Sequence, residues 1–485
     1  MQDILNIHSR RELFCDGYLL NPQRTTAETI LHTPVRRETV FVCDNPWEGN
    51  TSNYYSFFYD AEFGIYRMYY KSGQAFVDSP TIKVHPSSQF CYAESTDGLH
   101  WTKPDLGLWG HTNILTRDLN IDNFFVFKDE NPACPPSQRY KAVCGYKTLW
   151  YYPSADGIHF RFEEGADLME MGAGYFDTLN VVRWDPTLGK YVGFFRMSRL
   201  ADGTIPKNMT DESRFVRCLR DIMYCTSEDF FHWDEPVPLS YGDDYIFELY
   251  TNCVSRYPRA PHIYTAFPTR YVQRQKWDCN YDALGGKEGR RMRYEKSDAG
   301  RGGLAVTETL FMTSRDGIHW TRFPEAFLRP GPQTEENWMY GDRYPAVGFL
   351  ETPNHIPGAD PELSMLIPDG RLSEKPSQLV RYSLRMDGFV SLHAGYEEKV
   401  VVTKPFIYTG NALHINFSTS AAGFVQVKLK DFQSNALLSP ELFGDSTDRT
   451  VPFYDGDPGM LEGRPVVLEV RMSDADLYSI QFRDE

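Results

Sequence analysis

The chain has 485 residues, more than one ordinary hydrophobic core supports, so two domains or one large all-β domain are expected. It carries 66 acidic against 50 basic residues, a formal charge of −16, and no basic run interrupts this excess. Such a charge repels nucleic-acid phosphates and anionic lipid surfaces, so the sequence predicts neither a nucleic-acid partner nor a membrane partner.

Two further features concern location and cofactors. Residues 1–20 alternate polar and apolar side chains and lack the apolar core of a secretory signal, and no stretch of ~18 apolar residues follows. The 9 cysteines are an odd number, without a C-x-x-C pair or a histidine at zinc-ligand spacing. We therefore expect reduced thiols, a cytoplasmic location for the chain as given, no metal and no cofactor. The oligomeric state stays open.

A short motif recurs along most of the chain. It has the pattern Ser-x-Asp-Gly-x-His-aromatic and begins at Ser95, Ser154 and Ser314, with Phe in place of Gly in the copy at Ser227. A shorter fifth copy contains Asp387. In this pattern Asp can bond back to turn amides and Gly supplies positive φ, which is the chemistry of a hairpin turn. We interpret the histidines of the motif as structural.

The spacing of the motif predicts the architecture. Its aspartates lie at positions 97, 156, 229, 316 and 387, and the intervals of 59, 73, 87 and 71 residues each have room for four short strands. Runs of strand composition precede each copy, for example at 54–59, 66–70, 123–127, 140–144, 180–184, 191–195, 263–267 and 346–350. Five such units predict an all-β fold, a five-bladed β-propeller with the motif between the third and fourth strands of each blade. Residues of about 11–42 should supply the strand that closes the ring.

The pattern changes after Asp387. Alternating strands at 413–417, 424–429, 465–470 and 477–482 predict a small C-terminal β-sandwich. We therefore divide the chain into a propeller at 1–392 and a sandwich at 393–485, packed together without a flexible linker. The stretch 273–303, rich in Arg, Lys, Asp and Gly, predicts a long surface loop, either an ordinary insertion, which we favour, or a lid.

In a propeller the first strand of each blade lines the central channel, so side chains distant in sequence converge there. Each predicted blade has an acidic residue near this position, namely Glu48, Asp122, Asp177, Glu248 and Asp342. A carboxylate between apolar strand residues is unfavourable unless it is paired or solvated. Five in equivalent places therefore favour a common site, although single members can cap strands or pair with arginines. Glu351 is a further candidate.

Paired carboxylates beside aromatic side chains are typical of glycoside hydrolysis. One carboxylate donates a proton and the other acts as nucleophile or base, and like-charge crowding raises the pKa of one of them. Aromatic rings supply faces on which a sugar stacks. We expect a carbohydrate substrate to contact a further group of residues, which are Trp47, Arg67, Arg196, Tyr250, Asn252, Arg270, Trp338, Asp342 and Arg343.

Together with residues 11–16, 47–49 and 176–180, the hairpin motifs resemble the five-bladed propeller glycoside hydrolases of families 32 and 43, the fructosidase and arabinanase relatives, and in particular a bacterial branch of them. The resemblance covers nearly the whole chain, including a trailing sandwich like that of family 32. It implies a base or nucleophile on blade one, a transition-state-stabilising Asp on blade two and a general acid on blade three. These roles fall on Glu48, Asp122 and Asp177, with Glu248 as the reserve candidate for the acid.

The chain departs from the family pattern in three ways. The Trp-x-Asn-Asp-Pro-Asn box typical of family 32 is absent, Glu48 stands where Asp is usual, and Asp177 stands where Glu is usual. The resemblance thus implies cleavage of a glycosidic bond, for instance in a fructoside or an arabinoside, without fixing the sugar or the anomeric outcome. Two alternatives stay open: a non-catalytic carbohydrate-binding propeller, and a sialidase-like hydrolase, a class with six blades and an arginine triad.

Overall fold

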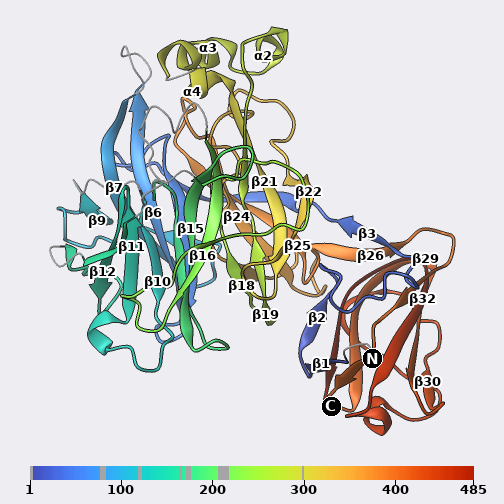
Figure 1. Cartoon of the computed structure of the whole chain (residues 1–485). Coiled ribbons are helices and arrows are strands. Elements are labelled where there is room, and N and C mark those ends of the chain that lie inside the picture. The colour runs from blue at the N-terminus through green and yellow to red at the C-terminus, as the bar shows by residue number, and fades with distance from the viewer. Residues whose placement is uncertain are drawn as a thin grey trace.

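Five antiparallel β-sheets surround a common axis, and a further β-domain lies beside them (Figure 1). The computed structural model describes residues 4–76, 83–117, 123–162, 166–170, 176–205, 218–297 and 300–485. The sheets are the blades of a β-propeller, so the all-β, five-bladed fold predicted from the hairpin repeat is confirmed. Five blades do not fit the six-bladed architecture of a sialidase-like hydrolase.

Each blade has four principal strands, ordered outwards from the axis. The first contains β5 (Asn53–Asp60), β6 (Ile65–Phe76), β7 (Lys83–Ser95) and β8 (Trp101–Thr102), with β9 (Ile114–Arg117) also paired to β7. The second contains β10 (Phe125–Lys128), β11 (Tyr140–Gly145), β12 (Thr148–Ser154) and β13 (Ala166–Glu170). The third contains β14 (Val181–Asp185), β15 (Lys190–Arg199), β16 (Leu219–Ser227) and β17 (Val237–Pro238).

The last two blades are irregular in different ways. In the fourth, β18 (Ser255–Tyr257) is followed by β19 (Ala260–Ala266) and β20 (Thr269–Gln273), which both pair with β21 (Ala305–Ser314), and β22 (Trp320–Leu328) is outermost. The fifth contains β23 (Leu350–Thr352), β24 (Glu362–Asp369), β25 (Gln378–Arg385) and, from the N-terminal part of the chain, β4 (Val35–Val42). β4 runs antiparallel to β25, with Phe41 opposite Leu379, and closes the ring as predicted.

The repeated motif forms the same turn in four blades. In the first, the Ser95 hydroxyl accepts from the backbone N–H groups of Asp97 and Gly98, and Asp97 accepts from those of Leu99 and His100. Asp97 also contacts the His100 ring at 2.7 Å. The copies at Asp156, Asp229 and Asp316 lie between the third and fourth strands of their blades and repeat the Asp–His contact. The histidines therefore stabilise turns.

The fifth copy of the motif has a different environment. Asp387 is buried, adopts a φ of 60°, and accepts hydrogen bonds from Arg11, Ser479 and the Tyr257 hydroxyl. It follows β25 but leads into β26 (Val390–Ala394), which leaves the propeller and pairs with strands of the C-terminal domain. The expected third-to-fourth-strand hairpin is thus replaced by a connection between domains, because β4 already occupies the outer edge of this blade.

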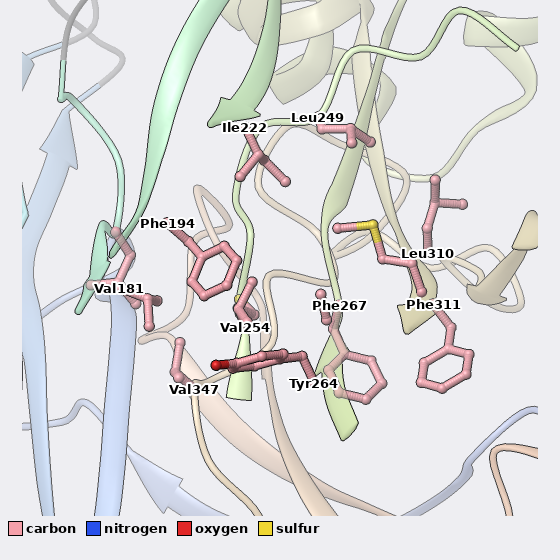
Figure 2. Packing of buried hydrophobic residues seen from close by; sticks show 14 of the residues in the cluster. Val181, Phe194, Ile222, Leu249, Val254, Tyr264, Phe267, Leu310, Phe311 and Val347 are labelled. Atoms are coloured by element: carbon pink, nitrogen blue, oxygen red, sulfur yellow. The ribbon is translucent and has the colours of Figure 1, made fainter. Parts of the chain in front are cut away.

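Apolar side chains of several blades pack into one core. Figure 2 shows Val181, Phe194 and Ile222 of blade three beside residues of blade four, including Tyr264, Phe267 and Phe311. These side chains are between 0% and 6% exposed. Because burial of such large side chains contributes roughly 1.5–3 kcal/mol each, this core holds neighbouring blades in fixed positions. The ends of the inner strands are fixed with it.

The C-terminal domain is a network of ten paired strands around a core of its own. Besides β26 it contains β27 (Lys399–Val402), β28 (Phe406–Tyr408), β29 (Ala412–Asp431), β30 (Ala436–Leu438), β31 (Asp445–Thr450) and β32 (Val466–Arg483). The first strands of the chain, β1 (Leu5–His8), β2 (Arg11–Leu13) and β3 (Glu28–Leu31), also pair here. The division at residue 392 and the two-layered sandwich stay predictions, and residues 5–31 belong by pairing to the C-terminal strands.

The described parts of the stretch 273–303 contain helices, whereas a surface loop was expected. They include the helices α2 (Cys279–Ala283), α3 (Lys287–Lys296) and α4 (Arg301–Leu304), which lie beyond the ends of the blades (Figure 1). Arg290 donates to the carbonyls of Asn337 and Trp338, and Arg293 donates to that of Leu372. The insertion is therefore tied to blade five. No helix in the described ranges is long and apolar enough to cross a membrane.

Candidate functional site

Arginine, tyrosine and acidic side chains converge at one end of the propeller channel. They come from the segments before β14, β18 and β23, from β5, β15, β16 and β20, from the turn after β24, and from α4. We call this group the axial cluster, and its described members are Tyr54, Asp177, Arg196, Arg220, Glu248, Tyr250, Tyr271, Arg301, Tyr340, Tyr344 and Arg371. Blades one, three, four and five contribute to it.

Backbone hydrogen bonds fix the segment 248–250 at the centre of the cluster. The N–H of Leu249 donates to the carbonyl of Arg220, and the N–H of Tyr250 donates to that of Thr269. The N–H of Tyr271 donates back to the carbonyl of Glu248. This segment is therefore held between blades three and four, with Leu249 buried in the core and its two polar neighbours facing the cluster.

Two carboxylates of the cluster are each held by an arginine. Asp177 forms an ion pair with Arg196 at 2.7 Å. Glu248 forms an ion pair with Arg220. Both carboxylates keep some contact with solvent, because their side chains are 18% and 15% exposed. The guanidinium carbons of the two arginines also lie 4.3 Å and 5.0 Å from the centre of the Tyr250 ring. Tyr250 thus connects the two ion pairs.

The hydroxyl of Tyr250 accepts two hydrogen bonds. Tyr340 donates its hydroxyl proton at 2.7 Å, and Arg301 donates from Nη2 at 3.1 Å. Burial alone would raise the pKa of Tyr250, but the positive charges of Arg301, Arg196 and Arg220 outweigh it and lower that pKa below its usual value. Burial raises the pKa of Tyr340, which keeps its proton. The pair is arranged for Tyr250 to carry negative charge.

Arg371 completes the cluster from the turn between β24 and β25. Its guanidinium carbon lies 4.8 Å from the centre of the Tyr340 ring and 5.5 Å from that of Tyr344. The side chain crosses Gly341, where a Cβ atom would lie only 2.3 Å from the Arg371 Cδ. Gly341 also has a φ of 96°, which favours glycine. A glycine is therefore required here for Arg371 to reach the aromatic rings.

Glu48 is held outside the axial cluster, in the wall of blade one. Its carboxylate is fully buried and accepts from Lys103 Nζ at 2.6 Å, from the Asn45 N–H at 2.9 Å and from the Tyr70 hydroxyl. Both oxygens are thus satisfied by partners of the same wall. These contacts favour a structural role for Glu48, and its predicted role as base or nucleophile has no support in them.

The second-strand arginines of blades one and four are also engaged elsewhere. Arg67 pairs with the buried Asp60 and lies over the Tyr140 ring, between blades one and two. Arg270 pairs with Glu308, on the face of β20 opposite to that of the cluster member Tyr271. Of the predicted second-strand arginines only Arg196 lies in the axial cluster.

The remaining predicted contact residues have local structural partners. Asn252 donates to the carbonyls of Leu179 and Phe194, and Trp47 donates to the Asn113 side chain. Trp338 donates to the carbonyl of Gly331. Arg343 donates to the carbonyls of residues 329 and 330 and pairs with Asp369. These positions brace loops around the channel.

The other three acidic candidates lie apart from the axial cluster or outside the described residues. Asp342 is buried, and its Oδ2 accepts only from the Met339 N–H among the described residues; burial raises its pKa to about 7 despite the nearby Arg343. Glu351 lies at the other end of the channel, where it lines a cavity of about 540 Å³ with Lys128 and Arg183. Asp122 lies outside the described residues.

The structure thus brings together Asp177, Arg196, Glu248 and Tyr250 of the predicted site. Six neighbours were not predicted as site residues, namely Tyr54, Arg220, Tyr271, Arg301, Tyr344 and Arg371. For Arg301 a signal existed, since the insertion 273–303 is rich in arginine. The others alternate with ordinary strand and turn residues and carry no mark in the sequence. Among the described residues no group of His, Cys, Asp and Glu is arranged to hold a metal ion.

Comparisons with known proteins give structural likenesses alone. No family model and no curated protein sequence matches the chain. An arabinoxylan arabinofuranohydrolase of family 43 from Bacillus subtilis shares 11% identity with a TM-score of 0.42, over 93% of this chain and 99% of that one. A fructofuranosidase from Schwanniomyces occidentalis shares 11% with a TM-score of 0.38, over 94% and 99%. A family 32 β-fructofuranosidase from Bombyx mori shares 10% with a TM-score of 0.40, over 92% and 95%.

The families that the hairpin motifs resemble, 32 and 43, are thus represented among the similar structures. Similarities of this size carry no information on the activity of this chain. Its function has to be inferred from the axial cluster itself.

Proposed function

We propose that the chain is a glycoside hydrolase that acts at the axial cluster. The observation that carries this proposal is the pair of carboxylates, Asp177 and Glu248, which come from neighbouring blades and are each fixed by an arginine that also contacts the Tyr250 ring. Cleavage of a glycosidic bond requires a nucleophile or base and a proton donor at one site, and the two carboxylates together with the Tyr250 hydroxyl offer such groups at the end of the channel.

The ion pair favours a particular role for Asp177. The resemblance assigned it the general acid, but a carboxylate held by a guanidinium group is stabilised in its ionised form. We therefore assign Asp177 the nucleophile or the water-activating base. Arg196 orients it and is itself held by the carbonyl of Tyr250.

Proton transfer falls to Tyr250 in this proposal. Its hydroxyl is tied to a second proton carrier, Tyr340, and the surrounding arginines lower its pKa, so it can exchange a proton near neutral pH. Glu248 holds Arg220 against the Tyr250 ring and contributes the second negative charge beside an oxocarbenium-like transition state.

The proposal is tested by a screen against aryl furanosides and aryl pyranosides, with fructans and arabinans alongside. Turnover by the native chain is expected on at least one of them. On that substrate Y250F should lose the limb of the pH–rate profile that reports proton transfer, while D97N, which changes an exposed turn, should keep the native profile. If the native chain binds sugars in the screen without cleaving any, the proposal fails and the non-catalytic carbohydrate-binding propeller replaces it.

A further inference from the structure

The axial cluster holds more positive than negative charge. Its four guanidinium groups belong to Arg196, Arg220, Arg301 and Arg371, and its two carboxylates neutralise only the first two of them. Among the described residues neither Arg301 nor Arg371 forms an ion pair with a carboxylate. In a chain with a formal charge of −16, where acidic partners are abundant, this local excess is a distinct feature of the site.

Both unpaired arginines are incompletely hydrogen-bonded although much of each is buried. The Nε and Nη1 atoms of Arg371 and the Nε atom of Arg301 are buried without a hydrogen-bond partner. A buried donor without an acceptor is unfavourable, and more so when the group is charged. The two groups are therefore held in place at a cost that a bound anion would offset.

Two independent segments deliver these arginines to one ring. Arg301 comes from α4 and lies 4.1 Å from the centre of the Tyr340 ring, and Arg371 comes from the turn after β24 and lies 4.8 Å from it. The insertion that carries Arg301 is anchored to blade five through Arg290 and Arg293, and Gly341 leaves the space that Arg371 occupies. Tertiary contacts thus hold both guanidinium groups against the Tyr340 ring.

We propose that Arg301 and Arg371 form a subsite for the carboxylate of an acidic sugar, which makes the substrate class a uronic-acid-containing carbohydrate. A planar guanidinium group matches a carboxylate through two parallel hydrogen bonds, whereas a neutral sugar leaves both charges unpaired. The substrate class rests on the proposed function. Binding of a uronate does not, because the subsite would hold it whether or not the chain cleaves it.

The Tyr250 hydroxyl supplies a signal for occupation of the subsite. The groups that face it are the four arginines of the cluster, Asp177 and the rings of Tyr271, Tyr340 and Tyr344. A carboxylate bound at Arg301 and Arg371 reduces the positive potential at Tyr250 and therefore raises its pKa. Tyrosinate absorbs near-ultraviolet light more strongly than tyrosine, so the ionisation of Tyr250 can be followed by absorbance. The bound ligand should move the midpoint of this titration to a higher pH.

The test is calorimetric titration of the whole chain with D-galacturonate and D-glucuronate, each against its neutral parent sugar. We expect at least one uronate to bind tenfold or more tightly than its parent, with weaker binding at higher salt. The same uronate should raise the apparent pKa of the tyrosinate signal. Glucose 6-sulfate serves as a third probe, and its binding more tightly than both uronates would overturn the assignment of a carboxylate.

Two variants and one control locate the binding. R371Q should abolish the preference for the uronate, and R371K, which keeps the charge but loses the planar fork, should retain part of it. G341A leaves all charges in place but displaces Arg371, so it should weaken the preference without removing it. The control R471Q changes an exposed arginine of the C-terminal domain, which pairs with Glu398, and should bind like the native chain.

The melting temperature separates binding from folding. Without ligand, R371Q should melt at the same temperature as the native chain or higher, since it removes an unpaired buried charge. Equal affinity for uronate and parent sugar, or a uronate preference that survives in R371Q, would overturn the subsite. Uronate binding without hydrolysis of any glycoside, with uronosides added to the screen, would instead refute the proposed function and leave the subsite standing.

Discussion

Glu48 in the wall of blade one and Asp177 in the axial cluster occupy equivalent positions in their blades, but their environments differ. Both acids lie in segments that directly precede the first strand of a blade. Glu48 is fully buried between Lys103, Tyr70 and a backbone N–H, whereas Asp177 keeps 18% exposure and pairs with an arginine that also contacts Tyr250. The comparison teaches that access and surrounding charge, rather than position before a strand, mark a carboxylate available for chemistry.

The largest expected effect separates the two acids by activity. On any substrate that the screen identifies, D177N should reduce kcat by ~10²–10⁴-fold, because it removes a positioned ionised group. E48Q should keep kcat within a few-fold of the native value. Steady-state kinetics of both variants on one substrate decide the matter, and a larger loss in E48Q than in D177N would reverse the comparison.

The free energy of unfolding should fall more in E48Q than in D177N, the reverse of the order expected for activity. E48Q leaves Lys103, which is 15% exposed, without its buried partner, so the free energy of unfolding should fall by about 3 kcal/mol. The remaining contact of Lys103 with Asp44 reduces the loss but does not cancel it. D177N should change unfolding by less, since Asp177 and solvent are in contact. Urea unfolding measures both, and a double variant of Glu48 and Lys103 that is more stable than E48Q would identify the ion pair as the cause.

Asp342 differs from both Glu48 and Asp177, because it is a buried acid without an ion pair among the described residues. Its folded-state pKa is raised to about 7 from 3.8, so the unfolded chain loses its proton first as the pH rises. Stability from this group is complete below about pH 4 and is lost as the pH rises through 7, a fall of about 2–4 kcal/mol in the free energy of unfolding. D342N should remove this part of the pH dependence.

A matched control exists for that measurement. Burial of Asp97 is outweighed by hydrogen bonds from His100 and the backbone, which hold its pKa well below the usual range. Its contribution is present above the unfolded-state pKa and is lost only as the pH falls below about 4. Between pH 5 and pH 8, D97N should therefore keep the slope that Asp342 causes and lose only the part that comes from His100, whose pKa Asp97 raises. An unchanged slope in D342N would refute the raised pKa.

The smallest expected effect concerns Trp47, which was predicted to stack on the sugar. Its indole N–H donates to the Asn113 side chain at 2.8 Å inside the same wall as Glu48. W47F should therefore lower the free energy of unfolding by about 1 kcal/mol and leave KM unchanged. A rise in KM with unchanged stability would place Trp47 at the substrate and weaken the distinction between wall and cluster.

Much of the fold was readable from the hairpin motif, since each copy closes its turn with contacts inside seven residues. The prediction of a hairpin at the fifth copy was wrong for the same reason. The residues around Asp387 resemble the local turn motif, but Asp387 is bonded by Arg11 and Ser479, which belong to distant segments. The folded insertion was missed for a related reason. Its helices are short, and contacts with blade five, rather than helical periodicity, hold them.

Turn chemistry and strand alternation act over a few residues, so the five blades, the closing strand and the acids at the ends of inner strands could all be predicted without a structure. The sequence also predicted Asp177, Glu248 and Tyr250 as members of one site, and the structure brings these three together. The pairing of Asp177 and Glu248 with arginines, and of Glu48 with a lysine and a tyrosine, could be seen only in the folded chain. That outcome depends on side chains from several blades and from the insertion, and their distances follow from packing rather than from order along the chain.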